Sequence, residues 1–119
     1  MAHKSIMTTD DEHCYLCKRW LDVPEHHHIF GGSNRQNSEK YGLVVPLCHY
    51  CHNEPPNGVH FNKKRRLKLQ AEAQQVFESI EDHDSFMAVF GRNYIGEYLI
   101  YLEEENERLR ESGSNQPAE

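Results

Sequence analysis

Two Cys-x-x-Cys pairs constrain the fold of this chain more than any other feature of its sequence. Cys14 and Cys17 form the first pair, Cys48 and Cys51 form the second, and thirty residues separate the pairs. Four thiolates complete the tetrahedral coordination of a structural zinc ion, and a closed site of this kind stabilises a small fold directly. The separation exceeds the roughly 15–20 residues of a zinc ribbon, so we expect an inserted element between the pairs.

Length and composition agree with a metal-stapled single domain. The chain has 119 residues, of which 37% are hydrophobic, so its core is modest. The sequence contains no apolar run of signal-peptide or transmembrane length, so we expect a cytoplasmic protein without a membrane partner. Reducing conditions in that compartment favour metal-bound thiolates over disulfides.

Charge is distributed unevenly along the chain, although the net charge is −6. Residues 13–68 carry nine Lys/Arg and four Asp/Glu, whereas residues 69–119 carry three and twelve. A phosphate backbone responds to the local field more than to the net charge, so the first of these segments is a candidate nucleic-acid surface. Its densest basic run, residues 63–66, is either part of that surface or a solvated helix start.

Three consecutive histidines, His26, His27 and His28, lie between the cysteine pairs. In an extended segment His26 and His28 would share one face, and His27 would point to the other. Neutral imidazole binds divalent ions well and accepts protons near neutral pH. His52 and His60 follow the second cysteine pair and are candidate partners.

Residue patterns predict short strands in the first half of the chain and helices in the second. Strands are expected at 20–23, 28–30 and 41–47, with a polar loop at 35–40. Pro55-Pro56 and Asn57-Gly58 predict a loop between His52 and His60, with His52 at the end of a turn or short helix.

A helical period begins at residue 63, with Asn62 as its expected cap. It places Leu69, Ala73, Val76, Phe77 and Ile80 on one face. Two more helices are expected, at 84–90, ended by Gly91, and at about 95–111, lined by Ile95, Leu99, Leu102 and Leu109. The predicted fold class is α+β, with a flexible segment at 1–12, a helical extension at 63–111 and a disordered tail at 112–119.

The ordered motifs resemble those of the HNH, or ββα-metal, endonucleases. The resemblance rests on Cys-x-x-Cys, His-His-Ile-Phe-Gly-Gly, Gly-Leu-Val-Val-Pro-Leu-Cys-His-Tyr-Cys-His and Gly-Val-His-Phe-Asn, in this order. It covers about residues 14–62 and is most like the small phage and prophage members with a four-cysteine zinc, similar also to the recombination-enhancement nucleases. It implies a zinc-stapled, treble-clef-like ββα-metal core at 13–62.

The resemblance also implies residue roles in a one-metal DNA endonuclease. His28 matches the general base, and His27 matches a ligand of the catalytic ion, with His52 and His60 as further ligands. That ion would be Mg²⁺, Mn²⁺, Ni²⁺ or Zn²⁺, beside the structural Zn²⁺ of the four cysteines. The candidate DNA contacts are Arg35, Lys40, Lys63, Lys64, Arg65 and Arg66.

One position departs from the family pattern. Leu43 stands five residues before the third cysteine, where relatives often carry an Asn that steadies the loop holding the base. Asn34, Asn37 and Asn62 are candidates to replace it. The resemblance implies DNA as the partner in a bacterial or phage-infected cell, and it leaves open a recombinase or phage protein as a second partner and a monomer or homodimer.

Two other classes of function fit parts of the sequence. A non-catalytic zinc module that binds DNA or protein would explain the cysteines and the basic residues, but it gives His27 and His28 no role. Residues 48–52, Cys-His-Tyr-Cys-His, also fit the haem-attachment pattern of a c-type cytochrome. That class requires export and leaves Cys14 and Cys17 unexplained.

Overall fold

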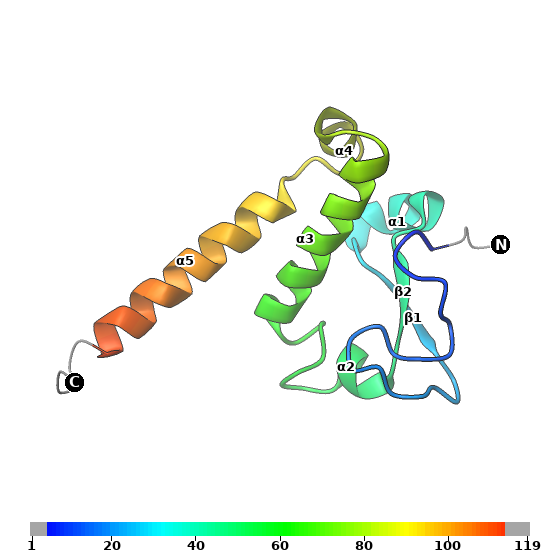
Figure 1. Cartoon of the computed structure of the whole chain (residues 1–119), viewed down its shortest axis with the longest axis horizontal. Helices are drawn as coiled ribbons and strands as arrows, with labels where there is room; N and C mark the ends of the chain where they lie inside the picture. Colours follow the sequence, from blue (N-terminus) through cyan, green and yellow to red (C-terminus); the bar gives the residue numbers. More distant parts are fainter. Residues whose placement is uncertain (1–4, 114–119) are drawn as a thin grey trace.

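Two short antiparallel strands, β1 (Glu25–His28) and β2 (Val44–Leu47), position the histidine-rich segment (Figure 1). The computed structural model, which describes residues 5–113, pairs His27 with Val45 and His28 with Val44. Every residue of β2 is buried, so β1 is held against an apolar strand. The pleat buries His27 and exposes His26, as the alternation predicts.

Short helices flank this sheet. Segment η1 (Gly32–Asn34) leads into α1 (Arg35–Tyr41), which connects the strands, and α2 (His49–Asn53) follows β2. The predicted loop at 35–40 is therefore wrong. Helix α1 has no apolar period, and contacts outside the helix stabilise it: Ser38 Oγ donates to the Phe30 carbonyl at 2.7 Å and accepts from the Phe30 N–H at 2.9 Å.

The C-terminal half consists of α3 (Lys63–Ile80), α4 (His83–Phe90) and α5 (Tyr94–Gly113), which confirms the three predicted helices. The predicted caps are confirmed as well, because Asn62 Oδ1 accepts from the Arg65 N–H at 2.9 Å and Gly91 ends α4 in the left-handed region at φ 80°. Helix α5 reaches two residues into the predicted tail, and residues 114–119 lie outside the described range.

The strand predictions are only partly confirmed. No strand forms at 20–23, where the described chain has only an isolated bridge between His13 and Trp20. Pro24 follows this segment, so pairing begins only at Glu25, and β2 begins at Val44 rather than at residue 41. In the predicted flexible segment, residues 1–4 lie outside the described range, whereas the Ile6 N–H donates to the Gly42 carbonyl at 2.9 Å.

An aromatic cluster joins the sheet region to the C-terminal helices. Phe30, two residues after the end of β1, packs against Phe86, Phe90 and Tyr94 with ring centroids 4.7–5.6 Å apart. Phe77 of α3 contacts the same cluster. This core anchors the chain that leaves β1, so the packing of α3, α4 and α5 bears directly on the placement of His27 and His28.

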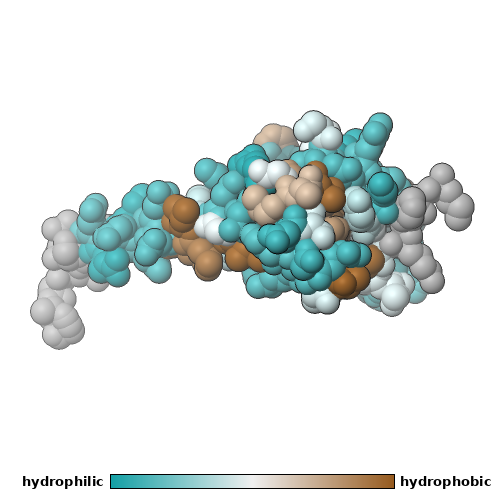
Figure 2. All heavy atoms as spheres, turned by 90° about the horizontal axis from the view of Figure 1, so that it is seen from above, coloured by the Kyte–Doolittle hydropathy of each residue, from teal (hydrophilic) through white to brown (hydrophobic). Residues whose placement is uncertain are grey.

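Helix α5 projects from the body after its first turns (Figure 1). Leu99 and Leu109, predicted to line a packed face, are exposed, and Figure 2 shows apolar residues on this projecting helix. Ile80 at the end of α3 is 61% exposed, although the helical period predicts it on the packed face. Across residues 5–113, none of the helices has the length and apolar character needed to cross a membrane.

We predict that Phe30→Ala lowers the free energy of unfolding by about 3–5 kcal/mol, because it leaves a cavity in the aromatic core. Phe61→Ala is the matched control, since Phe61 is 59% exposed and its loss should cost within about 0.5 kcal/mol. Urea unfolding followed by circular dichroism measures both. Equal effects of the two substitutions would contradict the assigned core.

Candidate metal centres

The four cysteines converge on one point from two distant segments. Their sulfur atoms all lie within 4.8 Å of one another, and the Sγ atoms of Cys17 and Cys48 are 3.8 Å apart. Two sulfurs bound tetrahedrally to zinc at about 2.3 Å lie about 3.8 Å apart. The arrangement therefore fits one closed zinc site, as the double Cys-x-x-Cys spacing predicts.

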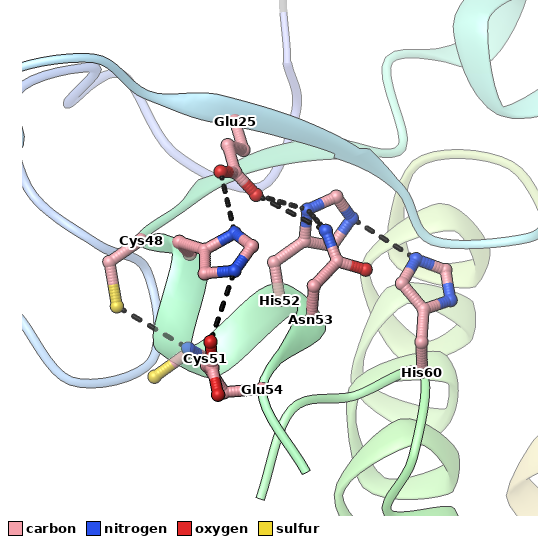
Figure 3. A network of polar contacts seen from close by, with 8 residues as sticks. Glu25, Cys48, Cys51, His52, Asn53, Glu54 and His60 are labelled. Atoms are coloured by element: carbon pink, nitrogen blue, oxygen red, sulfur yellow. Dashed lines mark hydrogen bonds and ion pairs between the residues drawn. The ribbon is translucent and has the colours of Figure 1, made fainter.

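Backbone N–H groups donate hydrogen bonds to these sulfurs, and such bonds favour the thiolate form that binds a cation. Cys48 caps α2, and its Sγ accepts from the Cys51 N–H at 3.4 Å (Figure 3). Cys14 Sγ accepts from the Cys17 N–H at 3.5 Å. Burial alone would raise the pKa of the Cys14 thiol, but backbone N–H groups outweigh it and lower that pKa to about 7. Burial raises the pKa of Cys51 to about 12 despite a hydrogen bond from Arg65, so metal binding must displace a proton there.

Three histidines form a second convergent group. His27 comes from β1, His52 from α2 and His60 from the loop before α3, and ligand nitrogens of the three lie within 4.8 Å of one another. The Nε2 atoms of His52 and His60 are 3.1 Å apart (Figure 3). Two nitrogens bound at about 2.1 Å to one ion lie about 3.0–3.4 Å apart, so these histidines can share a divalent ion.

His27 supplies the strongest evidence that this group could hold a metal ion. Its Nε2 is the one buried side-chain nitrogen or oxygen atom in the described part of the chain without a hydrogen-bond partner. Burial, followed by the neighbouring imidazoles of His52 and His60, lowers the pKa of His27 to about 3, so the ring is neutral at physiological pH. An unsatisfied buried nitrogen costs about 1–3 kcal/mol, and a metal ion would satisfy it.

Glu25 orients the second histidine of this group, and the sequence patterns did not identify it. His52 Nδ1 donates to Glu25 Oε1 at 2.8 Å, which leaves Nε2 as the ligand atom facing His60 (Figure 3). This hydrogen bond is the main reason that the pKa of Glu25 is lowered. A carboxylate behind a metal-binding imidazole is the usual way to fix its tautomer. Glu25 lies two residues before His27 on the same strand face, and that spacing was the available signal.

The loop that carries His60 is tied to the zinc site and to α3. The Val59 N–H donates to the Cys51 carbonyl at 2.8 Å, and the side chain of Arg66 donates to the Val59 carbonyl at 3.1 Å. A Cβ on Gly58 would lie 2.7 Å from the Glu54 nitrogen, so the close approach of these backbones requires glycine. His60 is thereby held beside His52, to which it also donates through its backbone N–H at 3.3 Å.

His28, the predicted base, lies outside the three-histidine group. It points toward α1, where its Nε2 is 2.6 Å from Glu39 Oε1, and its side chain is 15% exposed. His26 is exposed on the strand, with Nε2 3.9 Å from Asp11 Oδ1. The pleat thus separates His27, on the side of α2, from His28, on the side of α1.

The predicted DNA-contacting residues occupy different environments. Arg35 and Lys40 are exposed on α1, and Lys63 is exposed at the start of α3. Lys64 pairs with Glu105 of α5 at 2.7 Å. Arg65 is partly buried and donates to the Asn57 carbonyl at 2.6 Å and to Cys51 Sγ at 3.8 Å. The basic run therefore combines exposed cations with arginines that support the metal centres.

The candidate replacements for the missing Asn make other contacts. Asn34 of η1 donates to the Phe90 carbonyl at 3.2 Å and Asn37 of α1 to the Val89 carbonyl at 3.3 Å, so the two residues join η1 and α1 to α4. Asn62 caps α3. None of the three hydrogen-bonds a histidine within residues 5–113.

Comparison with known proteins identifies no relative of this chain. No family model, no curated protein and no solved structure matches the chain. The two clusters are therefore interpreted from their own geometry.

We predict that Cys51→Ser removes the structural zinc and disorders residues 14–62. Zinc binding contributes roughly 10–16 kcal/mol of apparent free energy in small metal-stabilised folds, of which one ligand carries a part. Zinc content by mass spectrometry and the melting temperature by circular dichroism measure the effect. A variant that keeps its zinc and its melting temperature would refute the four-sulfur site.

We predict that His27→Ala weakens Mn²⁺ or Ni²⁺ binding by at least about 100-fold, more than the 10–100-fold typical of residues behind the ligands. The cysteine-bound zinc should remain. His26→Ala is the control, because His26 is the exposed neighbour in the same strand. Isothermal titration calorimetry distinguishes the two variants, and unchanged binding by His27→Ala would remove the second centre.

Proposed function

We propose that this protein is a metal-dependent DNA endonuclease of the HNH, or ββα-metal, type. The observation that carries the proposal is the convergence of His27, His52 and His60 around a buried imidazole nitrogen that has no other partner. The chain forms two paired strands followed by a helix that carries a second histidine, beside the four cysteines. This order supports the resemblance that the motifs indicate.

The three histidines would hold one divalent ion and leave coordination positions for a phosphate oxygen and water. Such an ion stabilises the charge that develops on the phosphorus oxygens and on the departing 3′ oxygen. The chain's own contribution is orientation: Glu25 holds the His52 ring, and the ties from Cys51 and Arg66 hold the loop of His60. Imidazole ligands favour Mn²⁺, Ni²⁺ or Zn²⁺ over Mg²⁺.

His28 would act as the general base. It follows His27 at the end of β1 but lies on the side of α1, so a scissile phosphodiester would have to lie at this strand end to reach both the ion and the imidazole. The His28 side chain is 15% exposed, so water reaches part of it. Abstraction of the water proton by a positioned imidazole is general base catalysis, which typically contributes 10²–10⁴-fold to the rate.

DNA would approach the exposed cations of α1 and of the start of α3. Arg35, Lys40 and Lys63 are exposed and suited to phosphate contacts, which position a duplex without reading its sequence. Arg65 and Arg66 would contribute mainly through the loop they support. A partner such as a recombinase or phage protein, and a homodimer, belong to the same proposal through the resemblance.

A non-catalytic zinc module is the alternative, and the geometry favours it less. That function needs only the four cysteines and the cations. It gives no reason to bury His27 Nε2 without a partner beside two other imidazoles. A c-type cytochrome is disfavoured further, because the sulfurs of Cys48 and Cys51 face those of Cys14 and Cys17.

A plasmid-nicking assay with Mn²⁺ or Ni²⁺ tests the proposal. We expect the wild type to convert supercoiled DNA to nicked or linear forms and His28→Ala to lose about 10²–10⁴-fold in rate, the usual contribution of a base. His26→Ala should cut like the wild type. His28→Ala should also retain metal binding, since it removes no ligand.

If the wild type cuts no form of DNA with any of these ions, the enzyme proposal fails and a zinc-binding module remains. Cutting that is equally fast in His28→Ala would leave an enzyme with a different base.

A further inference from the structure

We infer that Glu39 is the positioning residue of the active site, acting through His28. Its carboxylate accepts the Nε2–H of the imidazole, which fixes the ring and leaves Nδ1 with the lone pair that takes the water proton. This inference rests on the proposed nuclease function and adds a residue that no sequence motif singled out.

The contact between the two side chains is short and joins separate elements. Glu39 Oε1 of α1 lies 2.6 Å from His28 Nε2 of β1, and the two residues are eleven positions apart in sequence. Hydrogen bonds to a carboxylate are stronger than those between neutral groups. Glu39 is 35% exposed and His28 15%, so the pair lies at the surface with the imidazole more enclosed than the carboxylate.

The chemistry of the pair determines which nitrogen can act as the base. An ionised carboxylate only accepts hydrogen bonds, so Nε2 must carry the proton. Neutral imidazole has one N–H, and Nδ1 therefore holds the free lone pair. Within the described residues, His28 Nδ1 makes no hydrogen bond that would occupy this lone pair.

The backbone around Glu39 is attached to the same segment that carries the base. Ser38, its neighbour, exchanges two hydrogen bonds with Phe30, and its carbonyl accepts from the Leu43 N–H at 2.8 Å. The Leu43 carbonyl in turn accepts from the Ile29 N–H at 3.0 Å. Helix α1 ends at Gly42, which adopts a left-handed conformation with φ 74°. Glu39 thus stands on a short helix that is bonded directly to Phe30 and, through Leu43, to Ile29.

This arrangement accounts for the absence of an Asn at position 43. The Leu43 side chain is fully buried in the core and cannot steady the base. Asn34, Asn37 and Asn62 bond elsewhere, and among the described side chains Glu39 is the one that hydrogen-bonds His28. The carboxylate from α1 supplies the orienting contact instead.

The carboxylate–histidine pairs of His52 and His28 have separate roles. Glu25 contacts Nδ1 of His52 and leaves Nε2 for the ion, whereas Glu39 contacts Nε2 of His28 and leaves Nδ1. The two imidazoles are thus held in opposite tautomers. A third pair, Glu78 with His83 at 2.7 Å, joins α3 to α4 and provides a matched control.

The test compares Glu39→Ala, Glu39→Gln and Glu78→Gln in the full chain. With Mn²⁺ and plasmid DNA, we expect Glu39→Ala to lower kcat by about 10–100-fold, the usual effect of losing a residue that orients an active-site group, without raising KM. Glu39→Gln should also lower kcat, because its amide can donate to Nε2 and favour the wrong tautomer. Glu78→Gln should keep the wild-type kcat.

Nitrogen-15 NMR of the zinc-loaded protein reads the tautomer without reference to activity. The His28 signals, assigned by their loss in His28→Ala, should show protonated Nε2 and unprotonated Nδ1 in the wild type and in Glu78→Gln. In Glu39→Ala they should shift toward a mixture of both tautomers. Circular dichroism checks that each variant is folded. If Glu39→Ala does not fold, Glu39→Gln replaces it in the test.

The outcomes separate this inference from the proposed function. A wild type that does not cut DNA overturns both. A wild type that cuts, with wild-type kcat and an unchanged His28 tautomer in the Glu39 variants, overturns the role of Glu39 alone. A rise in KM with unchanged kcat also overturns it, because Glu39 would then be a binding contact.

Discussion

The convergence of four sulfurs, which could together hold one zinc ion, is the constraint on which the rest of this structure depends. It joins residues 14–17 to residues 48–51, so the chain between them must leave and return to the same point, and β1 and β2 pair on that path. The second cysteine pair also forms the start of α2, which carries His52. The four-cysteine cluster therefore determines where His52 lies relative to His27, and the Val59–Cys51 hydrogen bond extends this control to His60.

Near the four-cysteine cluster, neighbouring groups fix the orientation of the histidine rings. Glu25 holds His52, Glu39 holds His28, and His27 is buried beside His52 and His60, with an Nε2 that makes no hydrogen bond among the described residues. Burying a polar atom in this way is unfavourable unless a ligand completes it. The aromatic core around Phe30 resists relaxation of the strand end. Residues 27–30 therefore contribute both to the stability of the core and to the proposed chemistry.

The predictable parts of this structure are those that depend on residue type and on spacing along the sequence. Ligand chemistry and spacing identified both cysteine pairs and the histidines, and a change of period at residue 63 identified α3. Helix α1 was missed because its polar residues show no period and Ser38 stabilises it through distant Phe30. Glu25 and Glu39 were missed for a related reason, since pairing with an imidazole depends on tertiary geometry. Leu99 and Leu109 have helical spacing, but spacing does not show whether another element covers them.

X-ray absorption at the nickel edge tests the central claim, a second ion held by imidazoles beside the sulfur-bound zinc, most directly. The protein would carry zinc at the cysteines and one equivalent of added Ni²⁺. The account predicts a nickel shell of nitrogen and oxygen atoms at roughly 2.0–2.2 Å, with the multiple-scattering pattern of about three imidazoles and no sulfur. Sulfur in the nickel shell, or a shell of water alone, would contradict it.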